Sequence, residues 1–418
     1  MTTQERIKSL REEQELSQEW LAEAMNCSLS SVQRSEALVR KFSNAEIQKA
    51  LSKLGLAGYP ITEDELKTFE NRLFIFRDTI RDGNYEKAQE DSKELDVITK
   101  SKLEPELATL YVTFLARLLL NLGKRSEARE KLETFGIGIS EHSVKLRYYF
   151  YHSFGILCIH EETYEKALEY LLMADETGID EEEVLQKHNL GLCYSRLGKY
   201  AVALITYERM YTKMSSGLSD KTAANVNNSI GASYLRLEHY DEAEKFLCVA
   251  LERATAISHT TLIGWSLHNL GTLHYKREQF RDGIKLFEQA SKYFDEDSSD
   301  FLENLYFKLL CMIKDKHPQR KASVEKAIEL AKDKEYYSML FNGLQHMFTI
   351  KNQSSKDFIV EQVLPSIKSR HDYFKTFEFF DVVEKSYLKS RFKYDDIKAL
   401  EIRSEAFEIY KIMTTGRN

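Results

Sequence analysis

Apolar residues at the start of the chain recur every three or four positions, which is the spacing of amphipathic helices. The series consists of Ile7, Leu10, Leu16, Trp20, Leu21, Ala24 and Met25. Ser17 and Ser28 each stand directly before a helical stretch, where a side-chain oxygen can cap the helix. Asn26 lies between the two stretches and tolerates the left-handed backbone of a tight turn. We predict two short helices joined by this turn.

A different pattern repeats over residues 153–291. Four segments align on a glycine that is followed by an aromatic residue nine positions later, a small residue twelve later and a large residue sixteen later. The glycines are Gly155, Gly191, Gly231 and Gly271, and the large residues are Leu171, Tyr207, Leu247 and Phe287. A period of about 36 to 40 residues is typical of stacked helical hairpins. We predict that two helices cross closely at each glycine and that the large residues fill the gap between neighbouring hairpins.

Weaker copies extend this array in both directions. Matches to the second half of the repeat lie around Ala88, Ala128, Ala327 and Ile397. We therefore expect eight or nine hairpins and an all-α chain. The richest cluster of chain-breaking residues is 55–61, which predicts a hinge between a domain over residues 1–58 and the array over residues 62–418.

Composition limits the classes of function. The net charge of −7 argues against a bulk polyanion binder. Five scattered cysteines without CxxC spacing suggest a reducing compartment, and no run of about 18 apolar residues predicts a membrane span. The histidines show no metal-ligand spacing, and there is no phosphate-binding loop or GxSxG motif. We expect a cytoplasmic protein with no cofactor, no metal and no enzymatic activity.

The second short helix carries the side chains that a DNA major groove requires. Small residues allow close approach, while Gln and Arg reach base edges and phosphates. The candidate DNA-binding residues are Gln18, Ser28, Ser30, Ser31, Gln33, Arg34 and Lys41. Residues 1–58 contain eight Lys or Arg and eight Glu, so this domain has no net charge. Because phosphate contacts dominate affinity, we expect a homodimer or higher oligomer on two half-sites of a palindromic double-stranded DNA operator.

Residues 4–57 resemble the Cro/repressor-type helix-turn-helix, and residues 45–56 look like its closing helix. The chain departs from the family pattern at Met25-Asn26, in place of the usual Leu-Gly of the turn, and at Ser35, where a larger apolar residue is common. The repeated segments resemble the tetratricopeptide repeat. These likenesses imply an N-terminal helix-turn-helix domain followed by a right-handed tetratricopeptide-repeat superhelix. By the first likeness, Gln18 would contact phosphate, while Ser30, Ser31 and Arg34 would face the DNA, with Gln33 a weaker candidate.

In such arrays the first helix of each hairpin lines a concave surface. The residues we expect there are His152, His188, Asn189, Asn225, Asn228, Trp265, His268, Asn269 and Tyr275. Asparagine side chains both donate and accept, so they can pair with the N–H and C=O groups of an extended peptide. A structural role is the alternative for each one: a hydrogen bond between repeats for an Asn, and a half-buried polar filler for a His.

A repressor-type prefix followed by such an array resembles the RRNPP family of peptide-sensing regulators of Gram-positive bacteria. The resemblance implies a transcription regulator that binds a short imported signalling peptide in its concave groove. The peptide would shift the population of DNA-binding arrangements. Whether it promotes or releases DNA binding stays open.

Three further interpretations remain open. Segment 62–140 could form the helical bundle of a peptide-controlled response-regulator phosphatase, as in other members of the same family. The chain could also be a scaffold for partner proteins, with the prefix as a structural cap. Finally, the C-terminal aromatics could form either a dimer contact or ordinary repeat core; they are Tyr373, Phe374, Phe377, Phe379 and Phe380.

Overall fold

The computed structural model describes residues 1–179, 183–213, 220–349, 352–370, 375–376, 379–380, 401 and 403–411. Over these residues all regular structure is helical, which confirms the predicted fold class. The chain divides into two compact units, Met1–Glu181 and Glu182–Asn418. The domain boundary predicted at residues 58–62 falls inside the first unit. Within the described residues, no helix is long and apolar enough to cross a membrane.

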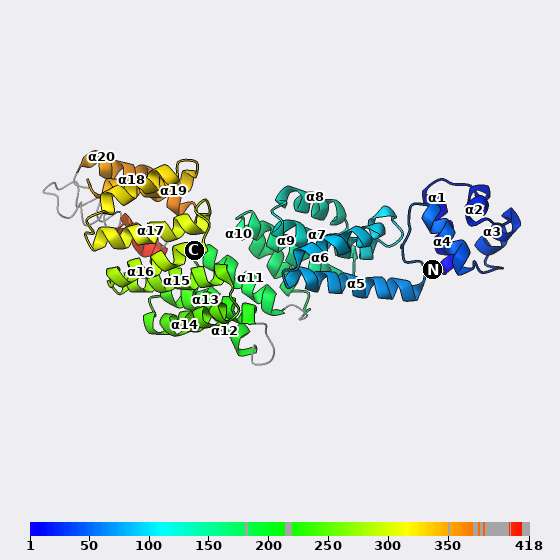
Figure 1. Cartoon of the computed structure of the whole chain (residues 1–418), viewed down its shortest axis with the longest axis horizontal. Coiled ribbons are helices and arrows are strands. Elements are labelled where there is room, and N and C mark those ends of the chain that lie inside the picture. The colour runs from blue at the N-terminus through cyan, green and yellow to red at the C-terminus, as the bar shows by residue number, and fades with distance from the viewer. Residues whose placement is uncertain are drawn as a thin grey trace. The chain divides into compact units, whose positions relative to one another are not determined.

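The first unit begins with four short helices and continues with antiparallel hairpins (Figure 1). Its helices are α1 (Thr3–Glu13), α2 (Gln18–Met25), α3 (Leu29–Glu36), α4 (Asn44–Lys53), α5 (Glu63–Arg81), α6 (Tyr85–Leu95), α7 (Pro105–Asn121), α8 (Arg125–Phe135), α9 (Val144–His160) and α10 (Tyr164–Asp175). The 3-10 helices η1 (Asp96–Lys100) and η2 (Ile139–Glu141) lie in its loops. Helices α5 and α6, α7 and α8, and α9 and α10 pair as hairpins.

The second unit continues the hairpin pattern. Its helices are α11 (Glu183–Arg196), α12 (Tyr200–Lys213), α13 (Asp220–Arg236), α14 (Tyr240–Ala256), α15 (Thr260–Lys276), α16 (Phe280–Ala290), α17 (Ser299–Lys314), α18 (Arg320–Leu330), α19 (Glu335–Met347), α20 (Gln353–Phe358) and α21 (Leu364–Lys368). A 3-10 turn, η3 (Ser291–Tyr293), follows α16, and a π-helical segment, η4 (Ile359–Val363), joins α20 to α21. Consecutive hairpins contact one another through α12 with α13 and α14 with α15.

Each repeat glycine lies in the first helix of a hairpin and faces the large residue sixteen positions later. A Cβ atom added at Gly231 would lie 2.7 Å from Leu247 Cγ, and one at Gly191 would lie 2.4 Å from Tyr207 Cε1. The glycines therefore mark the close helix crossing, as predicted. The large residue, however, lies against the glycine of its own hairpin, because a helix without Cβ there leaves a notch for it.

In the weaker repeats, the small residue lies in the second helix of its hairpin. Ala88 in α6, Ala128 in α8 and Ala327 in α18 are buried, which supports hairpins at those positions. Ile397 lies outside the described residues, as do Tyr373, Phe374 and Phe377. Phe379 and Phe380 belong to the core of the second unit, so these two follow the repeat-core interpretation.

The turn inside a hairpin places a residue with positive φ two positions after the first helix ends. Glycine fills this position after α5, α7 and α11, at Gly83, Gly123 and Gly198. Glutamate fills it after α9, α13 and α15, with φ of 58° at Glu162, 64° at Glu238 and 61° at Glu278. The left-handed conformation reverses the chain so that the next helix can begin.

Candidate functional site

The turn between α2 and α3 has the geometry expected from its sequence. Asn26 adopts φ 56° and ψ 48°, the left-handed conformation predicted for it. Ser17 Oγ accepts from the N–H of Trp20 at 3.1 Å, and Ser28 Oγ accepts from the N–H of Ser31 at 3.2 Å. Two capped helices therefore meet across a tight turn, and α3 is held with one face against the core.

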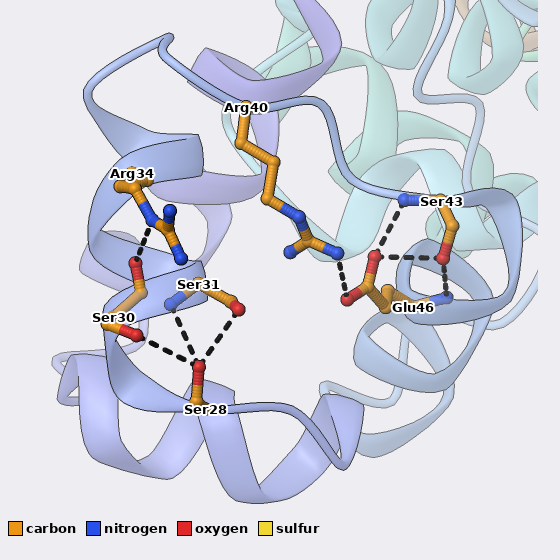
Figure 2. Close-up of polar contacts among 7 residues, drawn as sticks. All are labelled: Ser28, Ser30, Ser31, Arg34, Arg40, Ser43 and Glu46. Atoms are coloured by element: carbon orange, nitrogen blue, oxygen red, sulfur yellow. Dashed lines mark hydrogen bonds and ion pairs between the residues drawn. The ribbon is translucent and has the colours of Figure 1, made fainter.

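The outer face of α3 carries most of the predicted DNA-binding residues (Figure 2). Ser30, Gln33 and Arg34 are exposed and Ser31 is half-buried, while Val32 and Ser35 on the opposite face are buried. The Ser28 hydroxyl lies 3.0 Å from Ser30 Oγ and 2.9 Å from Ser31 Oγ. Arg34 Nε donates to the Ser30 carbonyl at 3.3 Å. These weak local bonds leave the hydroxyls and the guanidinium able to turn toward another partner.

Arg40 lies beside this face and was not among the residues predicted from the sequence. Its Nη2 donates to Glu46 Oε1 at 2.8 Å, and Glu46 Oε2 accepts from the N–H of Ser43 at 2.7 Å (Figure 2). Burial alone would raise the pKa of Glu46, but hydrogen bonds from Ser43 and Arg40 lower it. The pattern Ser43-x-x-Glu46 is a capping box, and Arg40 lies three residues before it. The neighbouring Lys41 is exposed.

A buried ion pair sets the position of α3 against α1 and α2. Arg11 contacts Glu36 through Nε to Oε1 at 2.8 Å and Nη2 to Oε2 at 2.9 Å, and its Nη1 donates to the Leu16 carbonyl at 2.6 Å. Only 9% of the Arg11 side chain and 3% of the Glu36 side chain are exposed. The hydrogen bond to the Glu36 carboxylate raises the pKa of Arg11. One carboxylate thus ties the C-terminal end of α3 to α1.

Gln18 joins the same network. Its Nε2 donates to Glu36 Oε2 at 2.8 Å, so its amide is engaged inside the domain. The predicted phosphate contact of Gln18 therefore competes with this bond and stays a prediction. This network could not be predicted from the sequence. Arg11 and Glu36 lie 25 positions apart, and no helical period connects residues at that separation.

In the second unit, some of the predicted peptide-binding residues are half-buried and others are fully buried. Asn225, Asn228 and Trp265 are half-buried and reach the surface from α13 and α15. Asn269 Nδ2 donates to Asn228 Oδ1 at 3.1 Å, which links the two helices. Among the described residues, no group pairs with Asn228 Nδ2, so this N–H₂ group can donate to a ligand carbonyl.

The other members in this unit lie beneath that surface, and they are His188, Asn189, His268, Asn269 and Tyr275. His268 Nδ1 lies 3.2 Å from Asn304 Oδ1, and its ring packs edge-on against Phe287 and Phe307. His188 Nε2 lies 3.2 Å from Ser229 Oγ. Burial lowers the pKa of His268 to about 3 and that of His188 to about 4, so both rings are neutral near pH 7.

In the first unit, His152 is fully buried in α9. Arg117 of α7 reaches it: Nη2 lies 3.3 Å from His152 Nδ1, and Nε donates to Ser153 Oγ at 2.7 Å. Arg77 of α5 donates to the hydroxyl of Tyr149 at 2.7 Å. Arg77 and Arg117 were not predicted from the sequence, because they lie in hairpins whose repeat signal is weak.

Comparisons with known proteins agree with this architecture. A tetratricopeptide-repeat family profile matches residues 222–296, which contain most of α13 to α16. The transcriptional activator NprA of Geobacillus stearothermophilus is 25% identical over 348 residues, covering 77% of this chain and 80% of NprA.

Two solved structures share the fold at low identity. NprR in complex with its cognate peptide NprX is 18% identical, has a TM-score of 0.66 and covers 82% of this chain and 99% of that one. A Rap protein complexed with Competence and Sporulation Factor is 15% identical, has a TM-score of 0.71 and covers 84% of this chain and 99% of that one. The solved structures share the fold of this chain, and the repeat profile and the similarity to NprA agree with the family resemblance of its sequence.

Proposed function

We propose that this protein is a transcription regulator, not an enzyme, and that it binds DNA through α3 and is switched by a short peptide. The observation that carries the proposal is the outer face of α3. Ser30, Gln33 and Arg34 are exposed on a capped helix whose opposite face is locked in the core. A scaffold protein has no use for a short polar helix held in this way. The activator NprA supplies independent support.

The peptide part of the proposal rests on the surface formed by α13 and α15. Asn228 on α13 offers an N–H₂ group, and the half-buried Trp265 lies on α15, the helix that Asn228 contacts through Asn269; such groups suit the backbone and one side chain of an extended peptide. The solved NprR structure contains a peptide, and its fold is the one seen here. We propose that the ligand is a short oligopeptide and that the DNA-bound form is at least a dimer on a palindromic site.

The first experiment is a pull-down of genomic DNA fragments with the full-length protein, with and without a small-peptide fraction from culture medium. Enrichment of a palindromic site that changes with the fraction is the expected result. No enriched DNA in either condition would overturn the regulator proposal and leave the phosphatase or the scaffold.

A substitution then tests the assignment of α3 on the enriched site. Arg34→Ala should weaken binding in a gel shift by roughly 10- to 100-fold, because a base-edge contact contributes about 1–3 kcal/mol. The matched control is Arg72→Ala, since Arg72 is an exposed arginine of α5. Equal binding by the Arg34→Ala variant and the wild type would exclude α3 as the recognition helix.

A second pair of variants tests the peptide surface. Asn228→Ala should weaken binding of the active peptide fraction several-fold in calorimetry, because a peptide carbonyl loses its donor. Asn342→Ala is the control, since the Asn342 side chain donates to Ser338 in its own helix. Unchanged affinity in the Asn228→Ala variant would move the peptide site elsewhere.

A further inference from the structure

The segment between α4 and α5 has the composition of a flexible hinge. Gly55 and Gly58 have φ of 71° and 82°, and a Cβ at either position would meet nothing within 4 Å. If this segment alone joined the helix-turn-helix to the repeats, the domain would turn freely. However, Leu56, Tyr59 and Ile61 in the same segment are buried. Something besides the chain connection therefore orders this region.

The ordering contacts come from α1 and the segment that precedes α7. Arg6 forms an ion pair with Glu104, with 9% and 21% of their side chains exposed. Glu13 Oε2 accepts from Ser101 Oγ at 2.5 Å, and Glu13 Oε1 accepts from the N–H of Lys102 at 2.8 Å. We call this set of contacts the α1 clasp, and it comprises Arg6, Glu13, Ser101, Lys102 and Glu104.

The geometry of the α1 clasp suits a fixed attachment. Arg6 and Glu13 are seven residues apart, two turns along one face of α1, so the helix is held at both ends. Charged groups take part in every contact, and such bonds are shorter and stronger than neutral ones. Glu13 also has both oxygens engaged on adjacent residues, Ser101 and Lys102. Two separated anchor points resist rotation in a way that one would not.

The clasp continues into the array through α7. Glu104 is the N-cap of α7, and Arg117 near the other end of that helix bonds to Ser153 and contacts His152 of α9. At 1.5 Å per residue, about 20 Å of continuous helix separates the two contact sets. A shift of α7 at its Arg117 end therefore moves the 101–104 segment that holds α1.

We propose that the α1 clasp fixes the orientation of the helix-turn-helix domain on the first hairpins, so that a movement of α7 reaches α3 through α1. The coupling rests on the proposed function, whereas the fixed attachment does not. Without the clasp the recognition helix turns on the 55–61 segment, and a movement of α7 no longer sets its direction.

Spin-label distance measurements on the full-length chain test the attachment. One label is placed on α2 with Glu23→Cys and one on α8 with Glu130→Cys, both exposed positions, in a background carrying Cys27→Ser and Cys248→Ser. The clasp predicts a narrow distance distribution. Arg6→Glu and Glu104→Arg should each broaden it, and the two together should restore it because the ion pair is rebuilt in reverse.

Two further variants keep the test decisive. Ser101→Ala removes one clasp bond without altering α1 and should broaden the distribution less than the charge reversals do. Arg72→Glu breaks an exposed ion pair with Glu94 and should leave the distribution unchanged. A distribution in the wild type as broad as in Arg6→Glu, or no recovery in the doubly reversed chain, would overturn the fixed attachment.

The measurement needs neither DNA nor peptide, so a failure of the proposed function leaves its result standing. Where the gel shift detects a response to the peptide fraction, the coupling is tested next. That response should be lost in Arg6→Glu and return in the doubly reversed chain. A full response in Arg6→Glu would show that the clasp positions the domain without transmitting the signal.

Discussion

The Arg11–Glu36 ion pair gives the sharpest prediction about how α3 is held. Glu36→Gln keeps the size of the side chain but removes the charge that faces Arg11. Arg11 would keep its bond to the Leu16 carbonyl at 2.6 Å and a contact of 3.2 Å with Glu12, whose side chain is 53% exposed. Breaking a buried pair costs about 3–5 kcal/mol, and these remaining partners place the expected loss near the lower end, about 3 kcal/mol.

Hydrogen exchange of the full-length chain measures this loss of stability helix by helix. A local measurement is needed because a chain of two units does not unfold in one global transition. A loss of about 3 kcal/mol should speed exchange of the protected amides in α1 to α3 by roughly 100-fold. Amides in α13 to α16 should be unaffected. The control is Glu94→Gln, which breaks an ion pair whose side chains are 44% and 73% exposed and should cost about 1 kcal/mol or less.

The reasoning has a second, stricter test. Arg11→Met combined with Glu36→Leu removes both charges, so it should recover much of the stability lost in Glu36→Gln. Acceleration of less than about 5-fold in Glu36→Gln would refute the view that this pair organises the domain. So would a double variant that is no more stable than the single one, since the penalty could not then come from the unpaired guanidinium.

Three other substitutions test separate features. Within the described part of the chain, the buried Ser35 Oγ has no hydrogen-bond partner, so Ser35→Ala should stabilise α3 by about 1 kcal/mol and slow its hydrogen exchange; faster exchange would mean that the hydroxyl is satisfied. Gly231→Ala should lower the thermal midpoint because its Cβ would lie 2.7 Å from Leu247 Cγ, and the drop should shrink in a Leu247→Ala background; an equal drop would exclude that clash. His268 has a pKa of about 3 in the fold against about 6.5 unfolded, so its share of stability is complete above pH 6.5 and falls by about 1.4 kcal/mol per pH unit below it. Thermal midpoints at pH 7 and 5.5 should therefore converge in His268→Gln, and an unchanged difference would assign the acid sensitivity to other groups.

The sequence predicted best those features that depend on residues close together in the chain. The caps at Ser17 and Ser28 and the left-handed turn at Asn26 all follow from side chains within three positions of the backbone groups they serve. The close helix crossing at the repeat glycines could also be predicted, because a hairpin places residues sixteen positions apart against one another. The gap that Leu247 fills could not be predicted. A repeat period places a residue along the chain but does not say which helix its side chain contacts.

The candidate sites were harder to predict because burial depends on distant partners. His268 lies within hydrogen-bond distance of Asn304, 36 residues later, and His188 lies within the same distance of Ser229, 41 residues later. Helical spacing placed both on the right helices without showing which of their neighbours cover them. The α1 clasp joins residues about 90 positions apart, and no periodic pattern connects them.

The three glutamates at the hairpin turns have a practical consequence for engineering the protein. Glu162, Glu238 and Glu278 occupy a conformation that glycine adopts freely and that costs a residue with a Cβ about 1 kcal/mol. Because Glu238 and Glu278 lie in separate turns, replacing both with glycine should add roughly 1 kcal/mol in total, since the entropy that glycine loses on folding offsets part of the gain at each turn. None of them lies on α3 or on the surface formed by Asn228 and Trp265. The array can therefore be made more heat-resistant for use as a biosensor while its proposed binding surfaces keep their natural residues.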